Sequence, residues 1–492
     1  MPLNVWNRHP DVEVRAVAPE EAQAGTKRAQ SELNEDADVL EIMPIGAGQE
    51  VGRSCILLKF RRRHIMLDCG LHPGLSGMAA LPFFDVIDPT SLDAILITHF
   101  HIDHAAALPY FLARNKGRFR GKVYMTHATK SVFRLLMLDY LRVSGNKALF
   151  TEAELNACLK RVTAVDFHQT VRPVAGVKFQ SFFAGHVLGA AMFFIEIGGV
   201  KILYTGDYSC HADRHLAAAE IPPERPDVLI SESTFGVMSL EPAAERERRF
   251  LRYVSDVVER GGKCLIPVFA TGRAQELMLL LEEHWRDNPA LQQVPIFYYS
   301  ALANRALDVY RRYVHTMNAS LVAQAQTTNP FNFRFIRNLG GRASSTASTL
   351  ENQGEACVVF ATPGMLQSGL SRRLFERWCG DRRNACIIPG YCVEGTLAKT
   401  LKGGHLDAVE SAKTGARLPL RMPVHFVTFA AHADFRESSS FIRQLQPSRV
   451  VLVHGEKSQV AQFSAALRRM QLRVLTPRNT QKVHLVFRAD TV

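Results

Sequence analysis

The sequence predicts an α/β protein in which one α/β domain is inserted into another. Six short apolar runs, rich in β-branched residues, each lead to a polar residue that can bind a metal or transfer a proton. Between about Gly236 and Arg421, strand patterns alternate with helix patterns, which is typical of a second parallel sheet. Because His432 and His454 follow that stretch, the second domain interrupts the sequence of the first.

Length and composition indicate a soluble protein of two or three domains. The chain has 492 residues, of which 47% are hydrophobic and 22% charged. No apolar run approaches the ~18 residues of a membrane helix. The first 25 residues lack the apolar core of a secretory signal and hold too many acids for a mitochondrial presequence. We therefore expect the cytosol or the nucleus, and no membrane.

Charge is distributed unevenly along the chain. Residues 1–38, predicted to be a flexible N-terminal arm, hold eight acidic and four basic residues and so carry −4. The remainder of the +12 chain therefore carries +16. A basic body of this kind suits a polyanion, of which nucleic acid is the commonest.

Nine cysteines are scattered along the chain, and no C-x-x-C pair occurs. This odd and irregular set argues against a disulfide framework and against thiolate zinc sites. We expect reduced, mostly buried thiols.

The first domain is predicted to begin with strands at 39–43, 54–60 and 64–67. Near-continuous apolar strands belong in a sheet that is covered on both faces, and ligands gather at the carboxyl ends of such strands. We therefore expect the six apolar runs to converge on one rim. The runs, each with the polar residue that it leads to, are 92–98 with His99, 177–184 with His186, 200–205 with Asp207, 227–231 with Glu232, 424–430 with His432 and 450–453 with His454.

The inserted domain has its own alternation of strands and helices. Its predicted strands are 263–269, 295–300, 356–361 and 384–389, and its predicted helices are 273–285, 302–317 and 371–378. Residues 340–355 are predicted to be a surface loop. The expected division is therefore 1–38 (arm), 39–235 (first domain), 236–423 (inserted domain) and 424–492 (first domain, second part).

The segment THFHIDH, residues 98–104, places four potential metal ligands within six residues. Alternate strand side chains share a face, so His99 and His101 can point the same way, while Asp103 and His104 open a helix predicted at 105–113. Imidazoles and carboxylates without thiolates favour zinc over manganese or iron. A single histidine beside a strand is more often a core or surface residue, but H-x-H-x-D-H is far more specific.

This pattern, followed by His186, Asp207 and His454, resembles the metallo-β-lactamase superfamily, and the inserted domain resembles its β-CASP branch of nucleases. The resemblance implies an αββα sandwich with an inserted β-CASP α/β domain. Longer stretches, such as THFHIDHAAALPYF, AGHVLGAAMFFIEI and GYCVEGTLAKT, are similar to the branch that cleaves messenger-RNA precursors. The similarity runs from about Glu41 to the C-terminus.

The resemblance also implies a site of two Zn²⁺ ions bridged by Asp207. Asp68 would accept an N–H from a ligand imidazole, and Glu232 with His432 would form the acid–base pair. RNA-acting members have histidine at the position of His454, whereas DNA-acting relatives have valine. One zinc would take His99, His101 and His186, and the other Asp103, His104 and His454.

The expected function is therefore a nuclear, zinc-dependent endoribonuclease that cuts pre-mRNA before polyadenylation, together with other subunits of the cleavage and polyadenylation complex. Two cations would activate a water for in-line attack on phosphorus. His432 would protonate the leaving 3′ oxygen, giving a 3′ hydroxyl and a 5′ phosphate.

Arg273 is a hypothetical substrate-binding residue. It follows Gly272 at a predicted helix start, where backbone N–H groups favour phosphate. An arginine on a solvated helix face is the alternative interpretation.

Three alternative functions fit parts of this sequence. A small-molecule metallo-hydrolase would not need the basic body or the large inserted domain. A catalytically inactive scaffold would lack ligands, and all seven are present. A paralogous nuclease of the Integrator complex remains open, although HPGLSGMAALPFFDVIDP is more similar to the polyadenylation branch.

Overall fold

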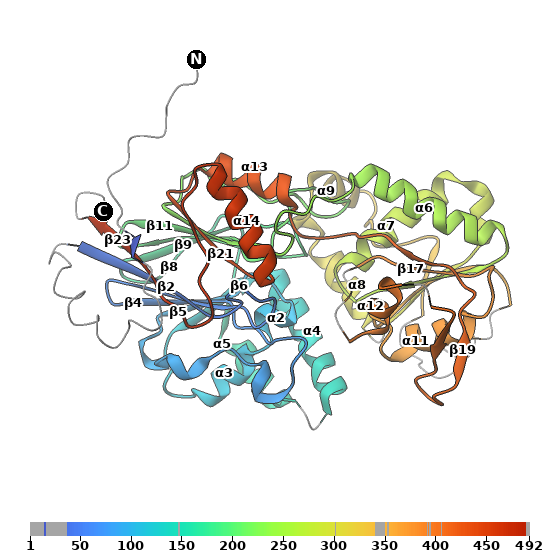
Figure 1. Cartoon of the computed structure of the whole chain (residues 1–492), viewed down its shortest axis with the longest axis horizontal. Helices are drawn as coiled ribbons and strands as arrows, with labels where there is room; N and C mark the ends of the chain where they lie inside the picture. Colours follow the sequence, from blue (N-terminus) through green and yellow to red (C-terminus); the bar gives the residue numbers. More distant parts are fainter. Residues whose placement is uncertain are drawn as a thin grey trace, which may run out of the picture. The chain divides into compact units, whose positions relative to one another are not determined.

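The computed structural model describes residues 14–15, 37–145, 148–300, 302–339, 350–351, 354–390, 392, 395–404 and 406–488. The chain forms two compact units, coloured along the sequence in Figure 1. The first unit comprises Met1–His211, Ala218–Ser239 and His432–Val492. The second comprises Ala212–Ala217 and Leu240–Ala431.

Two sheets form the centre of the first unit. The eight-stranded sheet has the order β1-β23-β2-β3-β4-β5-β6-β7, and the seven-stranded sheet has the order β22-β21-β12-β11-β10-β9-β8. The strands of the first sheet are β1 (Val14–Arg15), β2 (Ala37–Gly46), β3 (Cys55–Phe60), β4 (Arg63–Leu67), β5 (Ala94–Leu96), β6 (Lys122–Thr126), β7 (Val162–Val165) and β23 (Val483–Arg488). Those of the second are β8 (Thr170–Val174), β9 (Val177–Phe183), β10 (Ala191–Ile197), β11 (Val200–Tyr204), β12 (Val228–Glu232), β21 (Arg449–Val453) and β22 (Val474–Leu475).

Alternate side chains of both sheets form one buried core between them. Leu40 and Ile42 of β2 belong to it, as do Phe193 and Ile195 of β10, and all four have no exposed surface. Helices lie on the outer faces: α4 contacts β6 and β7, and α14 contacts β21 and β22 (Figure 1). The predicted four-layer αββα sandwich is therefore confirmed. Its helices are α2 (Ile102–Ala105), α3 (Leu108–Arg114), α4 (His127–Ser144), α5 (Glu152–Arg161), α13 (Phe435–Leu445) and α14 (Lys457–Arg469), with short 3-10 helices at Gly77–Ala80, Phe84–Val86 and Pro89–Ser91.

The second unit contains a six-stranded parallel sheet in the order β15-β14-β16-β13-β17-β20. Buried clusters cover both of its faces, as the apolar strands predict. Its strands are β13 (Lys263–Pro267), β14 (Ile296–Tyr299), β15 (Ile336–Asn338), β16 (Cys357–Ala361), β17 (Ala385–Ile388) and β20 (Val424–Phe426), with a separate pair β18 (Ala408–Glu410) and β19 (Arg417–Pro419). Its helices are α6 (Ala243–Glu259), α7 (Arg273–Asp287), α8 (Ala303–Arg312), α9 (Ala319–Ala325), α11 (Gly369–Trp378) and α12 (Leu397–Lys402), with 3-10 turns at Pro289–Gln293 and Val314–Thr316.

The unit boundaries differ from the expected ones at both ends of the insertion. The main segment of the second unit begins at Leu240 rather than 236 and extends to Ala431 rather than 423, and the short segment Ala212–Ala217 also belongs to this unit. The reason at the far end is that β20 pairs in parallel with β17 and so belongs to the second sheet. The six apolar runs accordingly lie in three sheets, although five of them lie in the sandwich of the first unit.

Two further expectations need adjustment. Within the predicted arm, β1 pairs with β23 at Val14 and Leu485, and β2 already begins at Ala37; the rest of the arm lies outside the described residues. The helix expected at 105–113 is divided into α2 and α3, with Pro109 in the first turn of α3. Proline fits there because the first turn of a helix needs no N–H donor. Most of the predicted loop 340–355 is also outside the described residues.

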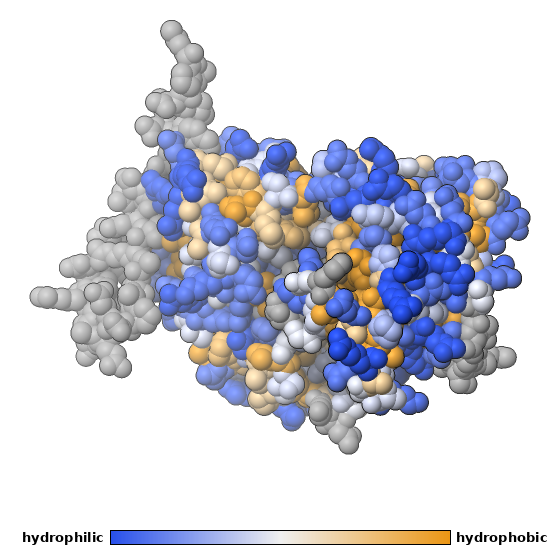
Figure 2. All heavy atoms as spheres, turned by 45° about the vertical axis from the view of Figure 1, so that its right-hand side comes forward, coloured by the Kyte–Doolittle hydropathy of each residue, from blue (hydrophilic) through white to orange (hydrophobic). Residues whose placement is uncertain are grey.

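The surface and the thiols agree with the composition. Hydrophilic side chains cover most of the face in Figure 2, broken by small apolar areas. None of the described helices combines the length and apolar character that a membrane crossing requires.

All nine cysteines are free, and eight of them are buried. The expectation of reduced thiols without a disulfide framework is confirmed.

Candidate metal centre

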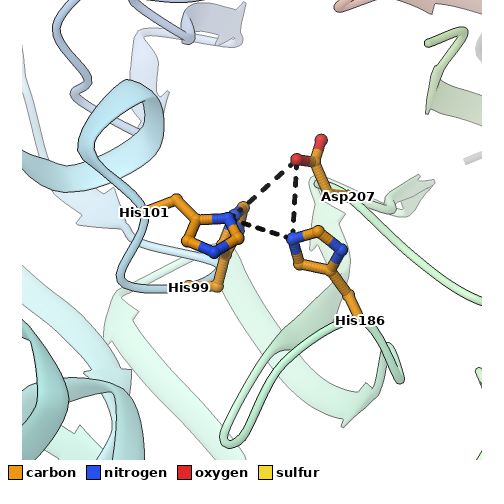
Figure 3. A group of neighbouring side chains, drawn as sticks. All are labelled: His99, His101, His186 and Asp207. Carbon is orange, nitrogen blue, oxygen red and sulfur yellow. Dashed lines mark hydrogen bonds and ion pairs between the residues drawn. The ribbon is translucent and has the colours of Figure 1, made fainter. Parts of the chain in front are cut away.

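The first group of potential ligands consists of His99, His101, His186 and Asp207, whose side chains point toward one another in Figure 3. Three of them lie just beyond the ends of β5, β9 and β11. His101 Nδ1 lies 3.1 Å from both His99 Nε2 and His186 Nε2. Asp207 Oδ2 lies 3.7 Å from the same two Nε2 atoms. Strand ends from both sheets thus bring these side chains together.

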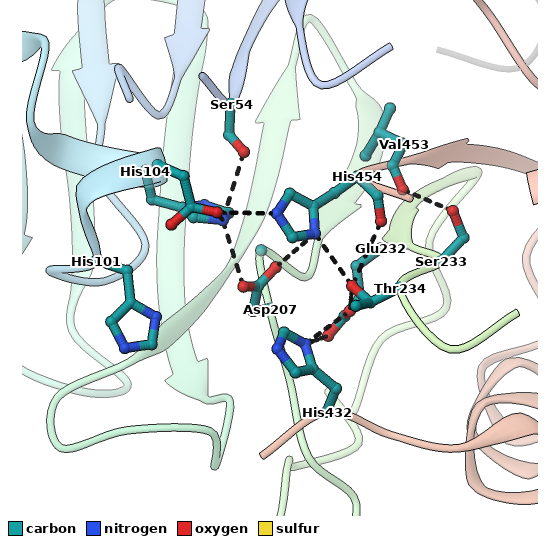
Figure 4. Close-up of polar contacts among 12 residues, drawn as sticks. Ser54, His101, His104, Asp207, Glu232, Ser233, Thr234, His432, Val453 and His454 are labelled. Atoms are coloured by element: carbon teal, nitrogen blue, oxygen red, sulfur yellow. Dashed lines mark hydrogen bonds and ion pairs between the residues drawn. The ribbon is translucent and has the colours of Figure 1, made fainter. Parts of the chain in front are cut away.

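The second group consists of Asp103, His104 and His454. Asp103 Oδ2 lies 3.2 Å from His454 Nε2 and 3.7 Å from His104 Nε2. Asp207 joins the two groups, because its Oδ2 is 3.3 Å from His104 Nε2 and its Oδ1 is 3.3 Å from His454 Nδ1 (Figure 4). The structure therefore brings all seven predicted ligands together, in the two sets that the family resemblance implies.

The backbone is unusual at three positions of this site. Asp68, His186 and His454 have positive φ angles of 60°, 51° and 48°. Aspartate and histidine tolerate this left-handed region better than most residues, but it still costs about 1 kcal/mol or more per residue. The fold holds these conformations because they turn the side chains toward the site.

Burial and charge set the protonation states of the imidazoles. Burial lowers the pKa of His101 to about 4 and that of His99 well below its ordinary value, so both rings are neutral at pH 7. Burial would also lower the pKa of His104, but the carboxylates of Asp207, Asp103 and Asp68 raise it well above the ordinary value. Negative potential is thus concentrated where the second group meets Asp207.

These residues fit a bound metal. Neutral imidazoles and ionised carboxylates are the donors that zinc accepts, and no thiolate belongs to either group. Oδ1 of Asp207 is buried and receives no hydrogen bond from the described residues. A buried carboxylate oxygen without a donor is costly unless a cation satisfies it. The donor set therefore supports metal binding.

Asp68 lies behind His104 and is completely buried. Its Oδ2 accepts a hydrogen bond from His104 Nδ1 at 2.8 Å, which is the contact expected of it. The hydroxyl of Tyr204 also donates to Oδ2, and the backbone N–H of Thr98 donates to Oδ1, both at 2.7 Å. Such a carboxylate orients the ring of His104 through Nδ1, so that Nε2 is the nitrogen that faces the ligand group. Sequence reasoning missed Tyr204, because a tyrosine in an apolar strand looks like a core residue.

His432 and Glu232 form the other expected pair. Nδ1 of His432 lies 2.9 Å from Oε2 and 3.0 Å from Oε1 of Glu232. Burial opposes protonation of His432, but Glu232 and Asp207 raise its pKa to about 9. Glu232 is held in turn by the backbone N–H of Tyr208 at 2.9 Å and by the hydroxyl of Thr234. Thr234 also escaped sequence reasoning, because threonines after strands are common.

Arg273 begins α7 in the second unit, as predicted. Its guanidinium is mostly buried, and its Nη1 donates to Oδ2 of Asp213 at 2.6 Å. The structure thus gives Arg273 an internal partner, which a phosphate would have to displace. The predicted RNA contact stays a prediction.

The fold and this site define the chain as a metallo-β-lactamase-type hydrolase with a β-CASP insertion. Residues 57–233 match the metallo-β-lactamase superfamily domain, and residues 274–401 match the β-CASP domain. Residues 417–477 match the Zn-dependent metallo-hydrolase RNA specificity domain.

Curated relatives specify the family. The chain is 50% identical over 469 residues to "Cleavage and polyadenylation specificity factor 73" of Drosophila melanogaster, covering 93% of this chain and 67% of the relative. It is 50% identical to "Cleavage and polyadenylation specificity factor subunit 3" of Dictyostelium discoideum (93% and 59%) and 47% identical to "Endoribonuclease YSH1" of Mycosarcoma maydis (96% and 54%). The chain belongs to this family of metal-dependent endoribonucleases, and it spans about two thirds or less of the length of these relatives.

Among solved structures, the chain resembles a protein of unknown function from Enterococcus faecalis. The TM-score is 0.56 at 12% identity, and the match covers 91% of this chain and 100% of that protein. At this identity the likeness concerns the fold alone.

Proposed function

We propose that this chain is a two-zinc endoribonuclease that hydrolyses phosphodiester bonds of pre-mRNA during 3′-end processing. It leaves a 3′ hydroxyl and a 5′ phosphate, and it acts in the nucleus with other subunits of a cleavage and polyadenylation complex. One observation supports the chemistry most: two sets of ligands share Asp207, with His432 and Glu232 beside them. The names and RNA-directed domains of its relatives support the substrate.

The seven proposed ligands form two sets, one for each ion. His99, His101 and His186 would hold one ion, and Asp103, His104 and His454 the other, while Asp207 offers an oxygen to each. Bound zinc would supply Lewis acidity toward the scissile phosphate and lower the pKa of a water. The low pKa values of His99 and His101 keep their lone pairs available at neutral pH. Asp68 keeps His104 oriented through Nδ1.

His432 would serve as the general acid. Glu232 lies 2.9 Å from Nδ1 of His432, and its charge favours the protonated imidazole. The proton on Nε2 is then available to the departing 3′ oxygen. Tyr208 and Thr234 hold the Glu232 carboxylate in place, so that the ring of His432 keeps one orientation.

The decisive experiment incubates the purified chain and Zn²⁺ with a short single-stranded RNA and determines the end groups of the products. A 3′ hydroxyl supports extension by poly(A) polymerase, and a 5′ phosphate supports ligation. Cleavage that survives both Asp207→Ala and metal chelation would overturn the proposal. Products ending in a 3′ phosphate would exclude the proposed route of proton transfer.

A further inference from the structure

The hydroxyl of Thr234 lies between the proposed acid–base pair and a proposed metal ligand. Thr234 follows two residues after Glu232, which ends β12. Its Oγ1 donates a hydrogen bond to Oε2 of Glu232 and lies 3.1 Å from Nδ1 of His454 (Figure 4). One small side chain thus contacts both parts of the site.

The direction of these hydrogen bonds follows from proton counting. A threonine hydroxyl has one proton, and here the ionised carboxylate of Glu232 accepts it. Toward His454 the hydroxyl can therefore only accept, so Nδ1 of His454 must carry a proton. Nε2, which lies 3.2 Å from Oδ2 of Asp103, is then the nitrogen of His454 that a metal would bind.

Asp207 does not replace Thr234 in this role. Its Oδ1 is 3.3 Å from Nδ1 of His454, but it receives no hydrogen bond from the described residues. Thr234 is therefore the hydrogen-bond acceptor that the geometry gives to that N–H.

The contacts join into one chain: His432 Nδ1 to Glu232, Glu232 to the Thr234 hydroxyl, and that hydroxyl to His454 Nδ1. We propose that Thr234 is a positioning residue that fixes the metal-binding tautomer of His454 and holds Glu232 for His432. This inference rests on the proposed function above, since it takes His454 as a metal ligand. It predicts that the hydroxyl of Thr234 couples the acid–base pair to the metal-binding residues.

The neighbouring Ser233 offers a matched control. Its hydroxyl donates at 2.8 Å to the carbonyl oxygen of Val453, the residue before His454. It therefore binds the same strand end, but it touches neither the imidazole of His454 nor the carboxylate of Glu232. A merely structural role of hydroxyls in this loop would make Ser233 and Thr234 equally sensitive.

The test measures zinc affinity of the full chain by competition with a chromogenic chelator. We expect Thr234→Val to weaken binding of one zinc by about 10- to 100-fold, as removal of such outer partners usually does. Thr234→Ser, which restores the hydroxyl, and Ser233→Ala should stay within about 3-fold of wild type. If Thr234→Val does not fold, Thr234→Ala takes its place. Wild-type zinc affinity without the hydroxyl, or equal losses in Thr234→Val and Ser233→Ala, would overturn the inference.

A second measurement separates this inference from the proposed function. At saturating zinc, Thr234→Val should still lower kcat for RNA cleavage, because Glu232 has lost a partner, and Thr234→Ser should recover most of it. A wild-type chain that binds zinc but cleaves no RNA would refute the proposed function, while the zinc titrations would still decide the role of Thr234. A wild-type chain that binds no zinc would refute both.

Discussion

Each unit contains a buried cluster of histidine and carboxylate side chains, and the two clusters are built on opposite principles. In the first unit, acceptor atoms face one another: three imidazole nitrogens meet within 3.1 Å contacts, and no described residue donates a hydrogen bond to Oδ1 of Asp207. In the second unit, Arg214 donates to Glu283 and Glu247 at 2.8 and 2.9 Å, and Arg273 pairs with Asp213. In the second cluster, arginine side chains therefore neutralise the carboxylates.

His215 shows the difference most clearly. It is fully buried in the second unit, and its Nδ1 lies 2.6 Å from Oε2 of Glu276. Its Nε2 has no hydrogen-bond partner among the described residues, and the rings of Tyr310 and Phe331 lie near the imidazole. Residue composition alone does not distinguish a metal site from a structural network. A metal site is distinguished by several acceptor atoms that lie close together without hydrogen-bond donors.

The largest effect should come from removing the shared acceptor. Asp207→Ala takes an oxygen from both groups of ligands and should lower RNA cleavage by on the order of 10³-fold or more, since several kcal/mol of charge stabilisation are lost. Bound zinc, measured by mass spectrometry of the metal content, should fall as well. Glu276→Gln in the second cluster should leave the zinc content unchanged. Equal zinc contents in Asp207→Ala and wild type would remove Asp207 from the metal site.

The next effect separates proton transfer from metal binding. His432→Asn should lower kcat by about 10²- to 10⁴-fold, the usual contribution of a general acid, while both zinc ions stay bound. His64→Asn is the control in the same unit, because the imidazole of His64 lies 2.7 Å from the hydroxyl of Ser91 and belongs to neither group of potential ligands. Loss of zinc in His432→Asn would instead make His432 a ligand.

A third prediction concerns pH and the second cluster. Burial would raise the pKa of Glu276, but bonds to His215 and the backbone N–H of Arg214, with the charge of Arg273, lower it to about 2. A depressed carboxyl pKa stabilises the fold above the unfolded value of about 4.5 and loses that contribution as pH falls toward 2. Glu276→Gln should therefore lower the Tm at pH 6, and the difference from wild type should shrink by pH 3.

The control for this pH effect is Glu241→Gln, which affects the more exposed pair of Glu241 with Arg249. Exposed pairs contribute about 0–1 kcal/mol, so this variant should follow wild type at both pH values. A Tm difference for Glu276→Gln that does not change between pH 6 and pH 3 would contradict the assigned ionisation.

The residues of the first cluster could be predicted because their spacing along the sequence is typical of metal ligands. H-x-H-x-D-H is specific by itself, and His186, Asp207 and His454 stand at the ends of apolar strands. The parallel sheet of the second unit was also predictable from its alternating pattern. Strand patterns do not reveal pairing partners, however, so the run that includes β20 was assigned to the wrong sheet.

What the sequence could not show are the partners of common residue types. Thr98, Tyr204 and Thr234 act through hydrogen bonds that form only when distant segments meet. The segment Asp213-Arg214-His215 looks like a solvated loop, yet its partners are glutamates on α6 and α7, together with Arg273. Its burial depends on packing at separations of about 30 to 70 residues along the chain.

The smallest predicted effect decides between the two interpretations of Arg273. If its main role is the internal pair with Asp213, Arg273→Ala should lower the Tm and change RNA affinity by less than about 2-fold. If it binds phosphate, the affinity should fall by more, and the salt dependence of binding should weaken by about one counterion. The control is Arg305→Ala on α8, an exposed arginine of the same unit. Because the guanidinium of Arg273 is mostly buried against Asp213, we expect the first outcome. Arg273 would then belong to the second cluster, in which arginines neutralise the carboxylates.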